Sequence, residues 1–218
     1  FKRVENTTDK DVFGLLNRSN VAVLDENSNK DASIVSTQRD LIAGEVSKDI
    51  ARRKLIPTDI VQAHDSGAIH FHDMDYIIQP MFNCCLVNLE DMLTNGTVIN
   101  GKRIDTPKSF QVACTVTTQI IAQVASGQYG GQSINGIDRI LAPYVRKSYD
   151  KYLELTLQEQ VEVYGMAPDV EKAEEIAWQR TKKEVKDGIQ TIQYQINTLM
   201  TTNGQAPFVT LFMHFDPN

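Results

Sequence analysis

Cys84 and Cys85 are adjacent in a short apolar segment, and their thiols are the most reactive groups in this part of the sequence. Neighbouring side chains of a strand point to opposite faces, so one thiol would face a site while the other packs into the core. The competing interpretation is that both are buried cysteines, which ordinarily behave as small hydrophobic residues. Cys114 falls on the apolar face of a predicted helix and is interpreted as packing. These residues alone leave the role of the pair open.

His70 and His72 stand two residues apart in an alternating segment, and Asp73 and Asp75 follow closely. Residues two apart share one face of a strand, so we expect the two imidazoles to lie side by side. Histidine and carboxylate side chains bind zinc, but a metal site needs a third ligand that this spacing does not identify. We therefore favour the alternative, in which both histidines are hydrogen-bonded polar residues that line a cavity or pack against the backbone, and we predict no metal ion.

A glycine-rich segment with the sequence GQYGGQS, residues 127–133, joins two predicted helices. Its backbone amides could cradle a phosphate or a base. However, it lacks the Gly-Lys-Ser/Thr ending of a P-loop and does not match the dinucleotide-binding fingerprint. The simpler interpretation is a tight turn, with Lys147 and Lys151 on the following helix as solvated charges.

The composition is that of a folded protein that does not coat nucleic acid. Hydrophobic residues make up 41% of the 218 residues and charged residues 23%, which suits a packed core. The net charge of −6 disfavours a nucleic-acid partner but allows a local basic pocket. No apolar run approaches the roughly 20 residues of a membrane span, so no membrane partner is expected. The odd number of cysteines, without a CxxC pair, favours a reduced intracellular protein.

The elements that position these residues follow from the spacing of apolar residues. We expect helices over residues 37–54, 58–64, 106–126, 137–152 and beyond, and 169–199. We expect strands at 68–72, 84–87 and 208–213, the last two buried, and a hairpin at 97–104 that turns at Asn100 and Gly101. Thr106 and Pro107 should open the third helix as N-cap and first residue, and Asp169 should cap the last helix.

Strands separated by long helices are typical of a parallel sheet or an α/β barrel. Phe1 is not an initiator and no signal peptide is recognisable, so we expect the numbering to begin inside a longer protein. The sequence also stops just after a predicted strand. Both features predict a fragment.

Seven segments in a fixed order make a more specific signature than any of these residues alone. They are ENSNKD at 26–31, TQRD at 37–40, HFHDMDY at 70–76, NCCLVNLEDML at 83–93, TPKS at 106–109, QVASGQYGG at 123–131 and NGQAPFVT at 203–210. Together they resemble the large subunit of the anaerobic (class III, glycyl-radical) ribonucleoside-triphosphate reductases. The resemblance covers nearly the whole chain, from about residue 15 onward.

The resemblance implies an α/β fold that is the first part of a ten-stranded α/β barrel of the ribonucleotide reductase and glycyl-radical type, with long helices forming a dimer interface. Residues 1–35 would be a helical lead-in that follows an absent N-terminal ATP cone. Residues 36–218 would be the first half of the barrel, with a specificity-effector region at about 97–165.

The resemblance also implies an activity. Members of this family reduce ribonucleoside triphosphates to deoxyribonucleoside triphosphates in the cytoplasm. A radical-SAM activating enzyme with a 4Fe-4S cluster installs a glycyl radical, and a thiyl radical then abstracts the 3′ hydrogen of the substrate. A second cysteine, matched here by Cys84, delivers the reducing hydrogen from the opposite face of the ribose. Formate is the expected reductant, although some relatives use a small redox protein, and the parent protein would hold a structural zinc ion.

Site residues follow from the same motifs. The expected catalytic residues are Cys84, with His70 and His72 helping to expel the 2′ hydroxyl or to position formate. The expected substrate-lining residues are Asn83, Ser109 and Asn203. Contacts to an ATP or deoxynucleoside triphosphate effector at a homodimer interface are expected from Asp105, Lys108, Gln119 and Lys151, and the 127–133 segment would reach from effector to active site.

The sequence contains no glycyl-radical segment, no finger-loop cysteine and no four-cysteine zinc site. The chain alone is therefore expected to be inactive. One alternative is a catalytically silent nucleotide-binding and dimerisation module that works with a separate second half. Another is a histidine-metal enzyme that uses His70 and His72.

Overall fold

The computed structural model describes residues 4–19, 31–202, 204 and 206–214, and it forms two compact units. Unit 1 comprises residues 1–83, 126–129 and 200–206, and unit 2 comprises 84–125, 130–199 and 207–218. Two short segments, 126–129 and 200–206, therefore belong to unit 1 although the residues on both sides of them belong to unit 2. The division at residues 35 and 36 that the family resemblance implies stays a prediction.

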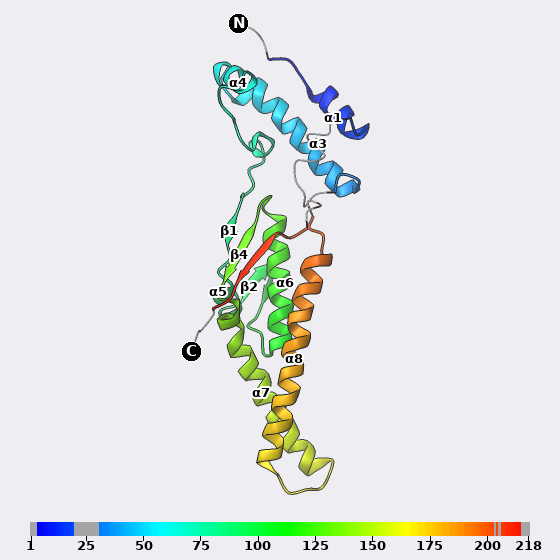
Figure 1. Cartoon of the computed structure of the whole chain (residues 1–218), viewed down its shortest axis with the longest axis vertical. Coiled ribbons are helices and arrows are strands. Elements are labelled where there is room, and N and C mark those ends of the chain that lie inside the picture. Colours follow the sequence, from blue (N-terminus) through cyan, green and yellow to red (C-terminus); the bar gives the residue numbers. More distant parts are fainter. Residues whose placement is uncertain (1–3, 20–30, 203, 205, 215–218) are drawn as a thin grey trace. The chain divides into compact units, whose positions relative to one another are not determined.

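Unit 1 is helical in its described residues. Its elements are α1 (Thr8–Leu16), α3 (Val35–Ile50), the π-helix η1 (Ala51–Leu55), α4 (Thr58–Asp65) and the 3₁₀ helix η2 (Met74–Tyr76) (Figure 1). Its small apolar core contains Ala51, Ile56, Val61 and Met74. The helices predicted at 37–54 and 58–64 are confirmed to within a few residues.

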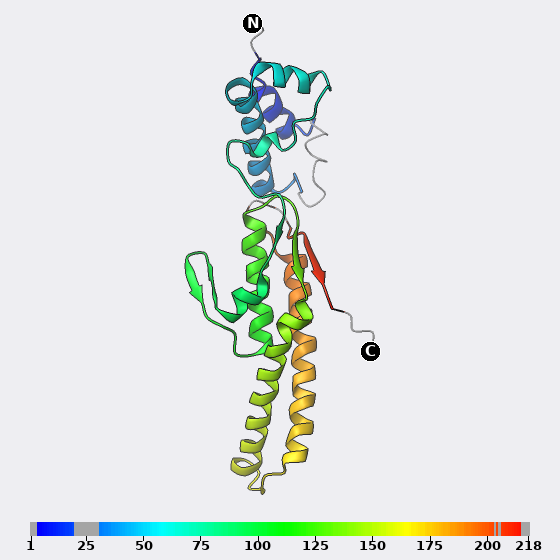
Figure 2. The ribbon, with the colours of Figure 1, turned by 90° about the vertical axis from the view of Figure 1, so that its left-hand side faces the viewer.

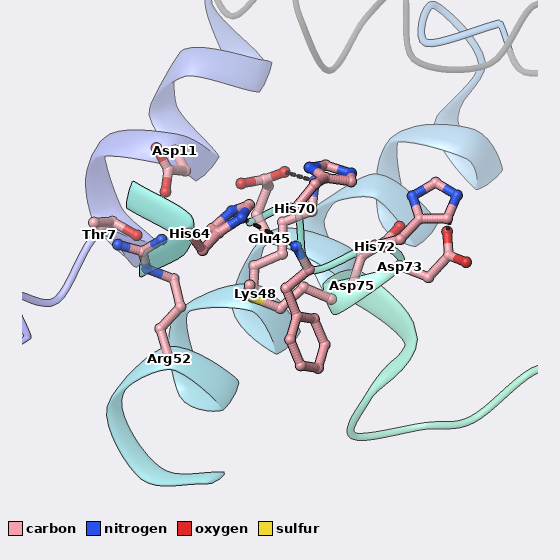
Figure 3. A pocket seen from close by; sticks show the side chains of 12 residues that line it. Thr7, Asp11, Glu45, Lys48, Arg52, His64, His70, His72, Asp73 and Asp75 are labelled. Atoms are coloured by element: carbon pink, nitrogen blue, oxygen red, sulfur yellow. Dashed lines mark hydrogen bonds and ion pairs between the residues drawn. The ribbon is translucent and has the colours of Figure 1, made fainter. Parts of the chain in front are cut away.

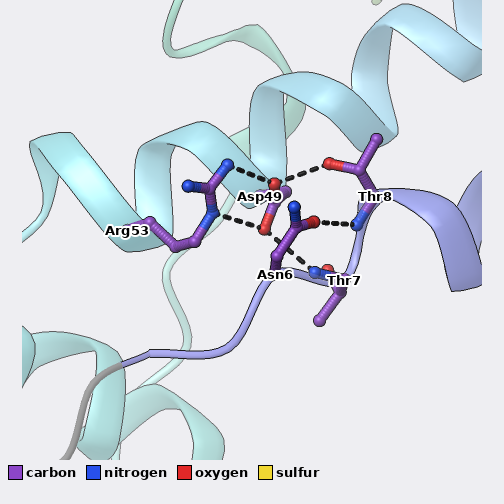
Figure 4. Close-up of polar contacts among 5 residues, drawn as sticks. All are labelled: Asn6, Thr7, Thr8, Asp49 and Arg53. Carbon is purple, nitrogen blue, oxygen red and sulfur yellow. Dashed lines mark hydrogen bonds and ion pairs between the residues drawn. The ribbon is translucent and has the colours of Figure 1, made fainter.

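Asp49 joins the start of α1 to α3 through a buried polar network (Figure 4). Its carboxylate, 1% exposed, accepts hydrogen bonds from Arg53 Nη2 at 2.7 Å and from Arg53 Nε at 3.0 Å. The hydroxyl of Thr8 donates at 2.6 Å and the backbone N–H of Thr7 at 3.1 Å. The hydrogen bonds from Arg53, with those from Thr8 and Thr7, lower the pKa of Asp49 from 3.8 to about 2.

The strand predicted at residues 68–72 was wrong. The structure has turns and bends there, and Asp73 adopts a left-handed conformation with φ 54°. Phe71 packs against the core of unit 1, and its backbone N–H donates to His64 Nδ1 at 3.2 Å. A strand requires a neighbouring strand to receive its backbone hydrogen bonds. Among the described residues of unit 1 there is none, so the alternation of Ile69 and Phe71 reflects a half-buried turn.

Unit 2 holds a small parallel sheet, a hairpin and three long helices. Its elements are β1 (Cys85–Leu86), α5 (Leu89–Thr94), β2 (Thr97–Ile99), β3 (Lys102–Ile104), α6 (Phe110–Ser126), β4 (Gln132–Asn135), α7 (Ile137–Glu162), α8 (Val170–Thr198) and β5 (Val209–Phe212) (Figure 1). The sheet has the order β1-β4-β5 and all its neighbours are parallel, with Cys85 beside Gln132 and Gln132 beside Val209. The predicted parallel sheet is confirmed, and the unit is mostly helical.

Helix α6 is the centre of the core of unit 2. Phe110, Cys114 and Ile121 on this helix are buried together with Ile134 of β4 and Ile192 of α8. Helix α8 comes very close to α6, because a Cβ added to Gly188 would lie 2.7 Å from the Phe110 ring. No helix of the described residues is long and apolar enough to cross a membrane.

Helices α7 and α8 form a long helical hairpin and lie side by side in both views (Figure 2). The predicted cap at Asp169 is confirmed, since its side chain accepts from Lys172 N at 3.1 Å. The amide of Gln160 closes the connection through two hydrogen bonds with the backbone of Asp169, at 2.8 and 3.2 Å. The hairpin at 97–104 is confirmed as well, with φ 49° at Asn100 and 73° at Gly101.

Helix α6 begins later than predicted. Thr106 does not cap it, because its hydroxyl donates to Thr94 O at 2.7 Å. Ser109 takes that place, and its Oγ accepts from Val112 N at 3.3 Å. Residues 84–87 and 208–213 do contain strands, but the prediction that they are buried was wrong, because Leu86 is 84% exposed and Phe212 is half exposed.

Candidate functional site

The two adjacent cysteines of unit 2 differ in their exposure to solvent. Cys85 begins β1, donates its backbone N–H to Gly131 O at 3.2 Å and packs against the apolar core. Cys84 precedes it and is exposed. Burial raises the pKa of Cys85, and burial together with the charge of Glu184 raises the pKa of Cys114 to about 12. Cys84 is thus the cysteine whose thiol is open to a ligand.

Cys84 lies just before β1 and two residues before the exposed Leu86, so strand alternation would place the two side chains on the same side. Gly131 precedes Gln132, which pairs with Cys85. Phe208 lies across Gly131, where an added Cβ would be only 2.8 Å from the Phe208 ring. Leu86 and Phe208 are both more than half exposed, and Cys84 is exposed as well.

The histidines predicted from the sequence lie in unit 1, around a cavity of about 410 Å³ (Figure 3). The rings of His70 and His72 are 5.4 Å apart, and His64, which the sequence did not single out, lies 5.6 Å from His70. His72 Nε2 is 3.5 Å from Asp73 Oδ1. Imidazoles can donate and accept protons, so this row could serve acid-base chemistry. Within the ranges that the structure describes, no three histidine, cysteine or acidic residues are grouped to hold a metal ion.

A second cavity, of about 450 Å³, lies in unit 2 beside the start of α6. It is lined by Ser109, Gln111, Val112, Lys151, Tyr152, Arg180, Lys183, Glu184 and Asp187. Three cations among these could attract phosphate groups. Arg180 also contacts Glu159 at 3.0 Å, and Lys183 contacts Asp187 at 3.0 Å.

Glu184 lines this second cavity and forms hydrogen bonds with both α6 and α7. Its carboxylate accepts from Gln111 N at 2.8 Å and from Ser148 Oγ at 3.1 Å, and Ser148 Oγ accepts from Phe110 N at 2.8 Å. A carboxylate at a helix N-terminus is favoured by the partial positive charge there. Burial and a hydrogen bond to Glu184 raise the pKa of Tyr152. Glu184 therefore holds α6, α7 and α8 in one arrangement around the cavity.

The predicted site residues divide between the two units. His70, His72 and Asn83 belong to unit 1, whereas Cys84 belongs to unit 2. Unit 2 also contains Ser109 and the four residues predicted to contact the effector. Among these five residues, Ser109 and Lys151 line the second cavity. The others, Asp105, Lys108 and Gln119, are exposed. Asn203 lies outside the described residues. The sequence did not single out Glu184 or Arg180, because charged residues on a long helix are usually solvated.

Comparison with known proteins defines the class of this chain. Residues 26–218 match the family described as anaerobic ribonucleoside-triphosphate reductase, and the chain belongs to that family. Two of its relatives are anaerobic ribonucleoside-triphosphate reductases. That of Salmonella typhimurium is 49% identical over 202 residues, which are 92% of this chain and 27% of that protein. That of Enterobacteria phage T4 is 44% identical over 206 residues, which are 94% of this chain and 32% of that protein.

The chain therefore spans about a third or less of the length of these relatives. Its fold also matches part of a solved structure, the anaerobic ribonucleotide reductase from Thermotoga maritima in complex with dATP and CTP. The TM-score is 0.61, and the match covers 97% of this chain and 36% of that chain at 13% sequence identity. At this identity, the match shows a shared fold.

Proposed function

We propose that this chain is part of a cytoplasmic reductase that converts ribonucleoside triphosphates into deoxyribonucleoside triphosphates by radical chemistry, and that Cys84 delivers the reducing hydrogen. The observation that carries the proposal is the contrast within the cysteine pair. Cys84 is exposed just before strand β1, while Cys85 and Cys114 pack against the core. Membership in the reductase family supports this proposed role for the exposed thiol.

In the proposed step, the S–H bond of Cys84 breaks as a hydrogen atom moves to a carbon radical of the ribose, where a new C–H bond forms. The thiyl radical left on sulfur is returned to the thiol with reducing equivalents from formate or a small redox protein. His70 and His72 would protonate the departing 2′ hydroxyl or hold formate. We assign the glycyl radical and the structural zinc to the rest of the parent protein, and a separate radical-SAM activating enzyme would install the radical, so this chain alone would be inactive.

The same proposal assigns residues 36–218 to the first half of a ten-stranded barrel. Its effector region would be residues 97–165, which include the α6–α7 part of the second cavity. Lys151, Arg180 and Lys183 around that cavity would attract the phosphates of a deoxynucleoside triphosphate. The α7–α8 hairpin would form the homodimer interface, since Trp178 and Ile189 are both half exposed on it.

We expect a deoxynucleoside triphosphate to raise the melting temperature of this chain more than the matching ribonucleoside triphosphate does. A ligand that binds only the folded state stabilises it by about 2.7 kcal/mol at 100 times its Kd. Differential scanning fluorimetry measures the shift. Lys151→Ala should reduce it, whereas Lys182→Ala, an exposed lysine of α8 outside the cavity, should not. Equal shifts for both nucleotides, or none at millimolar effector, would count against the effector site.

A further inference from the structure

Tyr129 belongs to the glycine-rich segment but makes its contacts in unit 1. Its phenol donates a hydrogen bond to Asp73 Oδ2 at 2.5 Å. Its ring stacks on Tyr76, with centroids 4.2 Å apart and planes inclined by 8°. Its backbone N–H donates to Phe82 O at 3.1 Å. The hydroxyl, the ring and the backbone N–H of Tyr129 therefore each make a contact with a residue of unit 1.

Asp73 is the residue that Tyr129 holds, and its backbone is in the left-handed region at φ 54° and ψ 37°. Aspartate adopts this conformation more readily than most residues, and here the conformation places its carboxylate between two neighbours. The two carboxylate oxygens of Asp73 have different neighbours. Oδ2 accepts from Tyr129, and Oδ1 lies 3.5 Å from His72 Nε2. Asp73 therefore connects the phenol to the row formed by His72, His70 and His64.

We propose that Tyr129 is a positioning residue that fixes the place of His72 by acting through the carboxylate of Asp73. The inference rests on the proposed function, in which His72 acts in the reductase site. Tyr129 lies in the connection between α6, which ends at Ser126, and β4, which begins at Gln132, and one hydrogen bond links it to Asp73 beside the histidine row. The glycine-rich segment thereby sets the geometry of a group that transfers protons, without touching the substrate itself.

The first test is the Tyr129→Phe variant of this chain with ¹³C-labelled histidines. The chain has four histidines, so each ring gives one signal that can be assigned by single substitution. We expect the His72 signal to shift or broaden, because the acceptor beside it loses its anchor, while His214 in unit 2 stays unchanged. Tyr194→Phe, which alters an exposed tyrosine of α8, should change none of the four. An unmoved His72 signal in a folded Tyr129→Phe chain would overturn the inference.

Asp73→Asn is a second variant that tests the same link if Tyr129→Phe folds poorly. Asparagine tolerates the left-handed region and keeps the size of the side chain. Burial, the hydrogen bond to Asp73 and the charge of Asp73 raise the pKa of Tyr129, so removing that charge should lower this pKa in an ultraviolet titration of the phenols. The His72 signal should move as in Tyr129→Phe. A Tyr129 pKa unchanged by this substitution would contradict the contact.

The functional arm uses the full-length reductase that contains this chain. A positioning role predicts that Tyr129→Phe lowers kcat by about 10- to 100-fold with little change in KM, since misplacing a reacting group by about an ångström has effects of this size. An unchanged kcat would overturn the positioning role. Unchanged turnover in His72→Gln would instead show that His72 takes no part in the reaction. That result would contradict the proposed role of His72, while the role of Cys84 is tested separately by substituting Cys84.

Discussion

Cys84→Ser in the full-length reductase is expected to lose deoxyribonucleotide formation by about a thousandfold or more, the scale seen when an enzyme loses the group that carries its chemistry. A serine hydroxyl has the shape of the thiol, but its O–H bond is too strong to give a hydrogen atom to a carbon radical. The glycyl radical should still form, because Cys84 acts after that step. Product analysis and electron paramagnetic resonance measure the two results in one sample.

Cys85→Ala is the matched control for this prediction. Cys85 packs into the core beside Gln132, so its loss should lower the free energy of unfolding by about 1 kcal/mol and leave turnover within a few-fold of the wild type. These results would show that Cys84 is needed for the reaction, whereas Cys85 contributes to the packing of the core. Normal turnover in Cys84→Ser, or equal losses in the two variants, would remove Cys84 from the mechanism.

Asp49→Ala is expected to lower the free energy of unfolding of unit 1 by about 2 kcal/mol, the scale of losing hydrogen bonds to a charged group. The substitution leaves Arg53 and the donors of Thr7 and Thr8 without their acceptor, and it releases the start of α1 from α3. Urea denaturation followed by circular dichroism measures the change. A loss below about 1 kcal/mol would mean that solvent replaces the carboxylate easily.

The same carboxylate predicts a pH dependence with a defined sign. Its folded-state pKa of about 2 lies below the ordinary value of 3.8. The stability that it contributes is therefore present above pH 4 and lost as the pH falls from about 4 towards 2. Asp49→Asn should be less stable at neutral pH and should flatten this part of the curve. An unchanged acid midpoint in that variant would contradict the network.

Much of the fold could be predicted because its signals are local. The Asn100–Gly101 turn and the cap at Asp169 depend on residues only a few positions apart, and both were confirmed. The strand at 68–72 and the start of α6 were wrong because distant partners decide them. His64 receives the N–H of Phe71, and Thr94 receives the hydroxyl of Thr106. Strand β4 was missed because its four residues show no apolar alternation before their neighbours are known.

The candidate site could be predicted in part, for the same reason. The difference in exposure between Cys84 and Cys85 agrees with the alternation of side chains expected along a strand. The contact between Tyr129 and Asp73 spans 56 residues of sequence, so no local pattern could indicate it. Two of the ordered motifs do meet in space, since Thr37 donates to Gly204 O at 2.9 Å in unit 1. An added Cβ on Gly204 would lie 2.4 Å from the Thr37 hydroxyl, which accounts for a small residue there.

The most direct test of the central claim is substrate protection of the thiols in the full-length reductase. The protein is treated with iodoacetamide with and without a saturating ribonucleoside triphosphate and its effector, and peptide fragmentation separates Cys84 from Cys85. We expect substrate to slow the alkylation of Cys84 and to leave the rates of Cys85 and Cys114 unchanged. Alkylation of Cys84 at the same rate in both samples would contradict the claim that its thiol faces the bound ribose.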